Sequence, residues 1–210
     1  VLETGWLGRS LEVKYPGFPI GYPNAQMPDP LAINIGTTLP FSLQGQNLNI
    51  GYSTSDPQSL LNIINDTSGI VPNTDYGFEL SFLRLMKDQS NVYSNSIKTA
   101  YQYSYQDNIA YSTDQLAQQL KIVARLINGG LKTPVYIVKH PFSFDSHEFQ
   151  VNTGSKQTGK HADNLKILSD AIFAFQQDLL RLNKAEIVAG MTFSEFGRRI
   201  KSNDSLGTDH

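Results

Sequence analysis

The sequence predicts an α/β protein with a mostly parallel sheet, and three observations lead to this fold class. Residues 113–193 have the pattern helix, strand, helix, strand, and strands joined by crossover helices lie parallel. The first of these strands, residues 134–138, is apolar at consecutive positions, which is typical of a strand covered on both faces. Polar residues follow both strands, where open α/β sheets place their sites.

The composition limits the function classes. The 210 residues fit one domain, or one large piece of one. The net charge is −2 and no basic block occurs, so we expect no nucleic acid partner. No apolar run approaches the roughly 18 residues of a membrane helix, so we also expect no membrane span. The absence of cysteine excludes disulfides, thiol catalysis and cysteine-ligated zinc.

Residues 1–75 are predicted to form a Pro/Gly-rich excursion or lid that packs on the core. Proline disfavours helix at its own position and at the preceding one, and most of the 10 prolines lie before residue 58. Weakly alternating runs at 31–35 and 41–43 are candidates for short strands. Long segments of this kind are usually functional lids or flexible segments, and a plain structural covering is the alternative.

Residues 76–210 are predicted to form the α/β core that carries the site. Apolar residues three, four and seven positions apart predict helices, with Asp75 as the N-cap of the first and Thr113 or Asp114 as that of the second. In chain order the predicted elements are helix 76–108, a helix that ends at Gly129 and Gly130, strand 134–138, helix 161–182 and strand 186–193. Two strands do not make a stable sheet of this kind, so the missing strands lie outside this chain or in residues predicted to be loop.

The polar residues that follow the two predicted strands form the candidate site. They are, after the first strand, Asp145, His147 and His161, and, after the second, Glu195, Arg198, Asp209 and His210. Both sets leave a parallel sheet at the same edge, so they can converge. Imidazole with carboxylate suits zinc, manganese or iron, and such a metal activates water and neutralises charge on a phosphoryl or sulfuryl oxygen. Arg198 would clamp that oxyanion with two hydrogen bonds.

Two other interpretations of these residues stay open. One is a solvated loop with salt bridges, in which Arg199 pairs with Asp204. It stays open because the Asp-x-His and Asp-His motifs are each only weak indications of a metal site. The other is a serine nucleophile, Ser194, which also follows the second predicted strand. Its surroundings do not match the G-x-S-x-G elbow, because position 192 is Thr.

The order of several motifs resembles a large bacterial family of domains of unknown function. The motifs are Thr4-Gly5-Trp6-Leu7-Gly8-Arg9, then Phe144-Asp145-Ser146-His147 with Gln150, His161, Thr192-Phe193-Ser194-Glu195-Phe196-Gly197-Arg198-Arg199, Asn203 and Gly207-Thr208-Asp209-His210. The family is the one numbered fifteen-oh-one, which is grouped with the alkaline-phosphatase and sulfatase superfamily. The resemblance spans the whole chain.

The resemblance implies a three-layer α/β/α sandwich of the alkaline-phosphatase type, with metals at the carboxyl edge of the sheet. It implies two divalent ions (zinc, manganese, calcium or magnesium), held by Asp145 with His147 or His161, and by Asp209 with His210. Arg198 and Glu195 would then be catalytic. Ser194-Glu195 stands where hydrolase relatives place their Asp-His pair at the strand end, and Asp209-His210 comes later in a loop, which is a departure from the superfamily pattern. Members are typically exported, so we expect a periplasmic or extracellular protein.

The implied function is metal-dependent hydrolysis of phosphate or sulfate esters, with a small anionic ester as substrate. The alternative is a non-catalytic secreted or surface-associated binding protein of the same fold. Family members begin with a strand that carries a Gly-Gly-Asn-Asp-Gly-Leu-Asn type motif and continue past the Gly-Thr-Asp-His block. We therefore expect this chain to be a central fragment that is inactive alone, and the remainder of its polypeptide to complete the incomplete fold.

Overall fold

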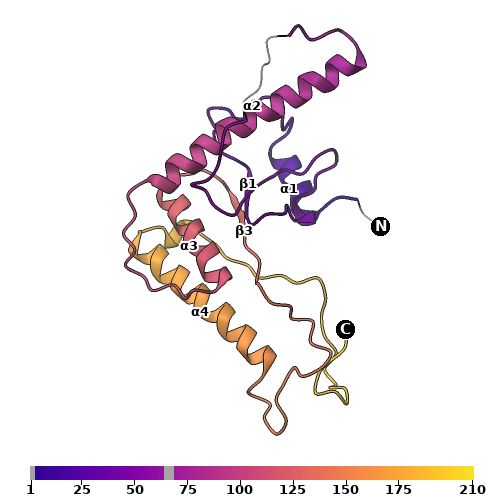
Figure 1. Ribbon diagram of the computed structural model, residues 1–210, viewed down its shortest axis with the longest axis vertical. Helices are drawn as coiled ribbons and strands as arrows, with labels where there is room; N and C mark the ends of the chain where they lie inside the picture. The colour runs from indigo at the N-terminus through magenta and orange to yellow at the C-terminus, as the bar shows by residue number, and fades with distance from the viewer. Residues whose placement is uncertain (1–2, 64–68) are drawn as a thin grey trace. The chain divides into compact units, whose positions relative to one another are not determined.

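The computed structural model describes residues 3–63 and 69–210, and the chain divides into two compact units (Figure 1). The first unit consists of Val1–Gln106 and Arg125–Val138. The second unit consists of Asp107–Ala124 and Lys139–His210. All three strands belong to the first unit, and the predicted site residues belong to the second.

The first unit is built on a parallel three-stranded sheet in the order β2-β1-β3. The strands are β1 (Ala32–Ile35), β2 (Gly51–Thr54) and β3 (Val135–Ile137). Ala32 of the central strand is opposite Gly51 on one side and Val135 on the other. β1 is buried along its whole length, as expected for a strand with a neighbour at each edge and cover on its faces. The predicted α/β class with a parallel sheet is therefore confirmed.

Two of the three strands come from the region predicted to be an excursion. β1 coincides with the candidate strand at 31–35, and β2 has no counterpart among the predicted strands. The candidate at 41–43 is wrong, because Phe41–Leu43 forms the short 3₁₀-helix η1. The strands that are missing from the predicted two-stranded sheet therefore include segments within residues 1–75, which are predicted to be an excursion. A lid role for residues 1–75 stays a prediction.

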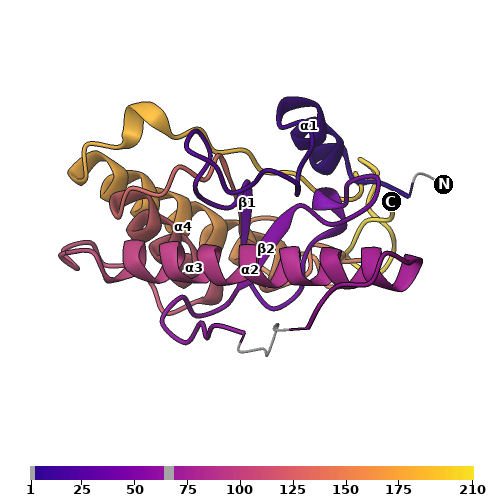
Figure 2. The same cartoon turned by 90° about the horizontal axis from the view of Figure 1, so that it is seen from above.

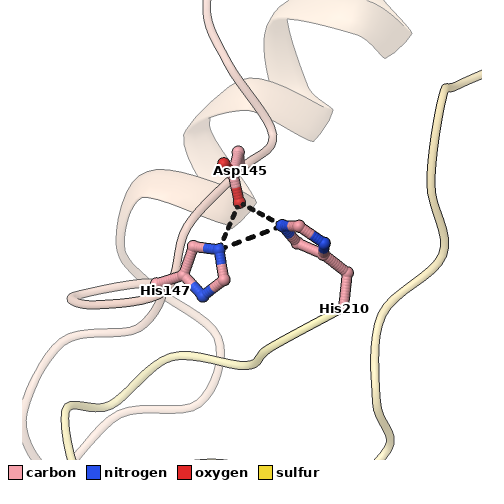
Figure 3. Close-up of side chains that lie close together, drawn as sticks. All are labelled: Asp145, His147 and His210. Carbon is pink, nitrogen blue, oxygen red and sulfur yellow. Dashed lines mark hydrogen bonds and ion pairs between the residues drawn. The ribbon is translucent and has the colours of Figure 1, made fainter.

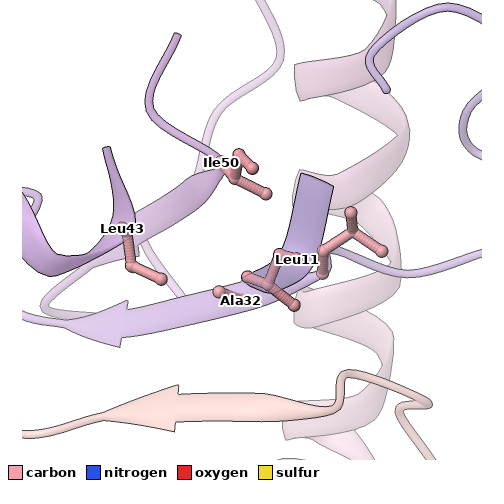
Figure 4. Close-up of a cluster of buried hydrophobic side chains, with 5 residues drawn as sticks. Leu11, Ala32, Leu43 and Ile50 are labelled. Atoms are coloured by element: carbon pink, nitrogen blue, oxygen red, sulfur yellow. The ribbon is translucent and has the colours of Figure 1, made fainter. Parts of the chain in front are cut away.

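One buried hydrophobic cluster of the first unit includes residues of helix α1 (Trp6–Lys14) and of strand β1. Its buried members are Leu11, Leu31, Ala32, Leu43 and Ile50, four of which Figure 4 labels. Helix α1 approaches the backbone that follows η1 so closely that a Cβ on Gly8 would overlap the carbonyl of Gln44. Glycine at position 8 is therefore required for this packing.

Helix α2 (Asp75–Gln102) starts and ends earlier than the pattern indicates. Its N-cap is Thr74, whose hydroxyl accepts a hydrogen bond from the N–H of Gly77 at 3.3 Å, so the prediction of Asp75 as the cap is wrong by one residue. At the other end, Arg125 lies 3.8 Å from the ring centroid of Tyr101 and donates to its carbonyl at 2.9 Å. Arg125 thus supplies a donor to one of the carbonyls that the end of a helix leaves without an intrahelical partner. Figure 2 shows α2 passing beside the strands β1 and β2 of the same unit.

Two predicted helices are confirmed, and both contribute to the second unit. Helix α3 (Gln115–Asn128) begins after Asp114, whose carboxylate accepts from the N–H of Ala117 at 3.0 Å. Helix α4 (Lys160–Arg181) ends before Asn183, which adopts a left-handed conformation with φ 55°. Among residues 3–63 and 69–210, no helix is both long and apolar enough to cross a membrane.

The predicted strand 186–193 is wrong. Residues Ala185–Ile187 form the 3₁₀-helix η2, and the following residues have no regular structure. The segment is extended at Val188, with φ −121° and ψ 123°, but no strand in the described part of the chain pairs with it. Ile187 and Met191 are 74% and 69% exposed. The apolar run has strand propensity without the ladder partner that makes a strand.

Candidate functional site

The loop that follows residue 139 is fixed by contacts with helix α4 of the same unit. The ring of Phe144 lies between those of His140 and His161, with centroids 4.9 and 5.8 Å away. The side-chain amide of Asn164 donates to the carbonyl of Ser143 at 3.0 Å. These contacts give a defined position to the backbone of the next residues in the loop.

The C-terminal segment forms backbone hydrogen bonds with this loop, although more than fifty residues of sequence separate the two. Two backbone hydrogen bonds, both 2.9 Å, run from Phe149 N–H to the Ser205 carbonyl and from Gln150 N–H to the Leu206 carbonyl. The side chain of Asn203 donates to the carbonyl of His147 at 2.7 Å. A Cβ on Gly207 would overlap the backbone of His147, so this close approach requires glycine.

Asp145, His147 and His210 form a triangle of potential metal ligands (Figure 3). The Nε2 atom of His147 lies 3.0 Å from Oδ1 of Asp145 and 3.1 Å from Nε2 of His210. The third side, from His210 Nε2 to the same carboxylate oxygen, is 3.5 Å. All three side chains are partly exposed, at 42–46%. The arrangement can present one oxygen and two nitrogens to a single cation from solvent.

Asp209 lies on the opposite side of the His147 ring. Its Oδ1 is 3.1 Å from Nδ1 of His147 and 3.2 Å from the side-chain nitrogen of Asn203. Hydrogen bonds from His147 and then Asn203 lower the pKa of Asp209. An ionised carboxylate only accepts, so His147 Nδ1 is the donor. In the neutral ring this leaves the Nε2 lone pair facing the triangle.

Two residues of the Ser194–Arg199 motif contact the other two members of the triangle, His210 and Asp145. The ring of Phe196 lies against that of His210, with centroids 4.6 Å apart and planes inclined by 30°. Arg198 donates from Nη2 to Oδ1 of Asp145 at 2.9 Å. The carboxylate oxygen of the triangle is therefore also an acceptor for a guanidinium.

The structure does not bring all the predicted site residues together. His161 lies against Phe144, its Nδ1 is buried without a hydrogen-bond partner among the described residues, and it is outside the triangle. Glu195 is exposed and no hydrogen bond or ion pair joins it to the described residues. The hydroxyl of Ser194 donates to the carbonyl of Phe196 at 2.8 Å, which is not the contact of a nucleophile with a base.

An open pocket of ≈ 430 Å³ adjoins the triangle. Its lining residues are mostly polar: Asp145, Ser146, His147, Glu148, Lys160, Asn203 and Ser205. Lys160 is the cationic side chain among them and is the first residue of helix α4. The pocket is large enough for a small substrate beside the potential ligands.

Sequence reasoning missed Lys160, Thr208 and the role of Asn203. Thr208 accepts from Arg198 and donates from its hydroxyl to Gln150 at 2.8 Å. Asn203 connects His147 to Asp209 through one side chain. Asn203 and Thr208 both lie inside recognisable motifs, but a motif does not state which group a polar side chain contacts. The position of Lys160 at the start of a helix could have been predicted, because it follows Gly159 and precedes a strongly periodic apolar pattern.

The comparisons with known proteins give a family and no activity. No curated protein and no solved structure matches the chain. A family model described as "Protein of unknown function (DUF1501)" matches residues 84–210, which is more than half of the chain and includes every residue of the triangle. The chain therefore belongs to this family of proteins of unknown function.

Proposed function

We propose that the protein is a metal-dependent hydrolase of phosphate or sulfate esters. The observation that carries the proposal is the triangle of Asp145 Oδ1, His147 Nε2 and His210 Nε2 beside a polar pocket. Three protein ligands with an accessible further position are the pattern of catalytic rather than structural metal sites. The resemblance to the alkaline-phosphatase and sulfatase superfamily supports the choice of ester.

The distances within the triangle fit a small divalent ion. At bond lengths of about 2.0–2.1 Å, tetrahedral zinc ligands stand roughly 3.3 Å from one another. The three sides measured here are 3.0, 3.1 and 3.5 Å. Two imidazoles and one carboxylate favour zinc or manganese over magnesium or calcium, which prefer oxygen ligands throughout. A divalent ion bound there would supply Lewis acidity, which polarises an ester oxygen and acidifies water.

The surrounding residues prepare the triangle for this role. Asp209 accepts from Nδ1 of His147 and so keeps Nε2 free to act as a ligand, which is the carboxylate–histidine arrangement typical of metal sites. Asp209 therefore supports a ligand in our proposal instead of being one. In the pocket, Lys160 lies among lining residues that include the carboxylates of Asp145 and Glu148, and it would supply one positive charge for an anionic substrate.

The superfamily resemblance extends the proposal to fold and location. We propose that the protein has a three-layer α/β/α sandwich of the alkaline-phosphatase type, to which the small sheet β2-β1-β3 contributes. We also propose that it acts in the periplasm or outside the cell. Both statements rest on the resemblance, and the parallel order of the three strands is compatible with the first.

The test is hydrolysis of 4-nitrophenyl phosphate and 4-nitrophenyl sulfate by the intact protein. We expect activity that chelation removes and that zinc or manganese restores. His210→Ala should abolish the metal-dependent rate, because it removes one corner of the triangle. Asp204→Ala is the control, since it removes an exposed side chain of the same segment that lies outside the triangle, and it should retain metal binding.

The alternative, a non-catalytic secreted binding protein, predicts a different result. In that case metal binds and His210→Ala weakens it, but no ester is hydrolysed by the wild type. An activity that survives chelation and disappears in Ser194→Ala would instead support the serine nucleophile. The hydrogen bond of Ser194 to Phe196 does not favour that outcome.

A further inference from the structure

Arg198 is engaged almost entirely by the protein itself. Its Nε donates to the carbonyl of Phe144 at 3.1 Å. Nη1 donates to both the carbonyl and the hydroxyl of Thr208, the latter at 3.0 Å, and reaches the carbonyl of Ser146 at 3.4 Å. Nη2 donates to Oδ1 of Asp145 at 2.9 Å. The side chain is only 15% exposed.

These contacts leave little of the guanidinium for a substrate. A guanidinium has five N–H donors in one plane, and two on one edge are needed to clamp an oxyanion. Here the Nε donor, both Nη1 donors and one Nη2 donor face protein acceptors. A substrate clamp would require breaking hydrogen bonds that are already made in a half-buried position, which is unfavourable.

The acceptors belong to the two segments that supply the triangle. Phe144, Asp145 and Ser146 precede His147, and Thr208 lies two residues before His210. The Asp145 oxygen that accepts from Arg198 is the same Oδ1 that faces both imidazoles. One planar group thus connects the loop that carries Asp145 and His147 with the segment that carries His210.

We propose that Arg198 is a positioning residue, which orients the Asp145 carboxylate and holds the two ligand-bearing segments together, and that it does not contact substrate. This inference rests on the metal site proposed above and goes beyond it, because it assigns Arg198 to the site's construction instead of to its chemistry. It replaces the substrate clamp that the sequence motif suggests.

Lysine cannot take over this role. Its ammonium group is a point charge with three donors at the end of a flexible chain, and the acceptors around Arg198 belong to four different residues. Arg198→Lys therefore keeps the charge and removes the geometry. Arg199→Lys is the matched control, because the Arg199 side chain is exposed and influences Asp209 through its charge, which lysine retains.

The test is a cobalt(II) titration of the intact protein, followed by visible absorption. We expect Arg198→Lys to bind cobalt about 10- to 100-fold more weakly than the wild type, as is typical when an outer partner of a metal ligand is lost. Its absorption bands should also change shape at saturation, since the carboxylate is no longer oriented. Arg199→Lys should match the wild type in affinity and spectrum. Equal affinity and equal spectra for the wild type and Arg198→Lys would overturn the inference.

A second measurement keeps the outcome independent of the proposed function. In the metal-free protein, Arg198→Lys should lose hydrogen-exchange protection at Phe149, Gln150 and Thr208, whose N–H groups join the two segments, and Arg199→Lys should not. A wild type that binds no cobalt would refute the metal site, and the exchange measurement would then decide the role of Arg198 alone. Unchanged protection in Arg198→Lys would show that the guanidinium does not hold the segments together.

Discussion

At the scale of single residues, Asp209 and His210 are neighbours in the chain but serve different sides of the candidate site. His210 reaches the triangle through Nε2, and Asp209 accepts from the far nitrogen of His147. From the sequence, the pair is predicted to be one ligand set, because the Asp-His motif does not reveal which atoms face each other. The two neighbours therefore face different nitrogens of the same ring, Asp209 facing Nδ1 and His210 facing Nε2 of His147.

Asp209→Ala should weaken zinc binding about 10- to 100-fold without abolishing it. The variant leaves all three corners of the triangle in place but removes the acceptor that fixes the tautomer of His147. Isothermal titration of zinc into the intact protein measures the effect. Asp204→Ala, an exposed carboxylate in the same segment, is the control and should bind as the wild type does. Loss of binding as complete as in His210→Ala would mean that Asp209 is itself a ligand.

Gly207→Ala should destabilise the second unit by about 1–3 kcal/mol, because its new Cβ overlaps the backbone of His147 and forces the two segments apart. Zinc affinity should fall at the same time. Gly197→Ala is a close control, since nothing lies within 4 Å of its Cβ position and its φ is not positive. Urea unfolding of the metal-free variants measures the difference. Similar unfolding free energies for the two variants would contradict the close approach.

The predicted site residues that the structure brings together share a local signal. Asp145, His147 and His210 stand in short motifs of polar residues after apolar runs, and their potential ligand atoms lie within 4.8 Å of one another. His161 has the right chemistry but starts helix α4, where its ring packs against Phe144. Side-chain direction at a helix start depends on tertiary packing, which a motif does not contain.

At the scale of secondary-structure elements, helices are predicted more accurately than strands. The boundaries of α3 and α4 follow from apolar spacing and from the residues that cap them, all within one element. A strand depends on a partner that lies far away in sequence. The segment 186–193 has the apolar composition of a strand but no partner within the described residues, whereas β2 has a partner without a strong pattern.

Asp114→Ala should destabilise the protein by about 1 kcal/mol at neutral pH, the usual effect of losing an N-cap. Partial burial raises the pKa of Asp114, but hydrogen bonds from Ser112 and from the Ala117 N–H outweigh this effect, so the pKa is lowered overall. The contribution of the ionised group is therefore complete above the ordinary aspartate pKa of about 4, and is lost as the pH falls through the lowered value. Urea unfolding at neutral and acidic pH should show a difference between variant and wild type that shrinks with acidification. A difference that grows on acidification would contradict this assignment.

At the scale of the whole molecule, the sheet and the candidate site belong to different units. The parallel sheet β2-β1-β3 is confined to the first unit, and all residues of the triangle, Asp209 and Arg198 belong to the second. Of the two predicted strands that precede the site residues, only the first forms in the described part of the chain, so convergence of these residues has another cause. That cause is the backbone pairing of residues 146–151 with residues 205–208, a non-local contact that no local pattern predicts.

We propose that Asp145, His147 and His210 bind one divalent cation. The decisive measurement is elemental analysis of the intact protein after dialysis against trace zinc and manganese. We expect about one ion per chain for the wild type, as for a three-ligand catalytic site, and a near-complete loss in His210→Ala. A wild type that retains no stoichiometric metal, or a His210→Ala variant that retains as much as the wild type, would contradict it.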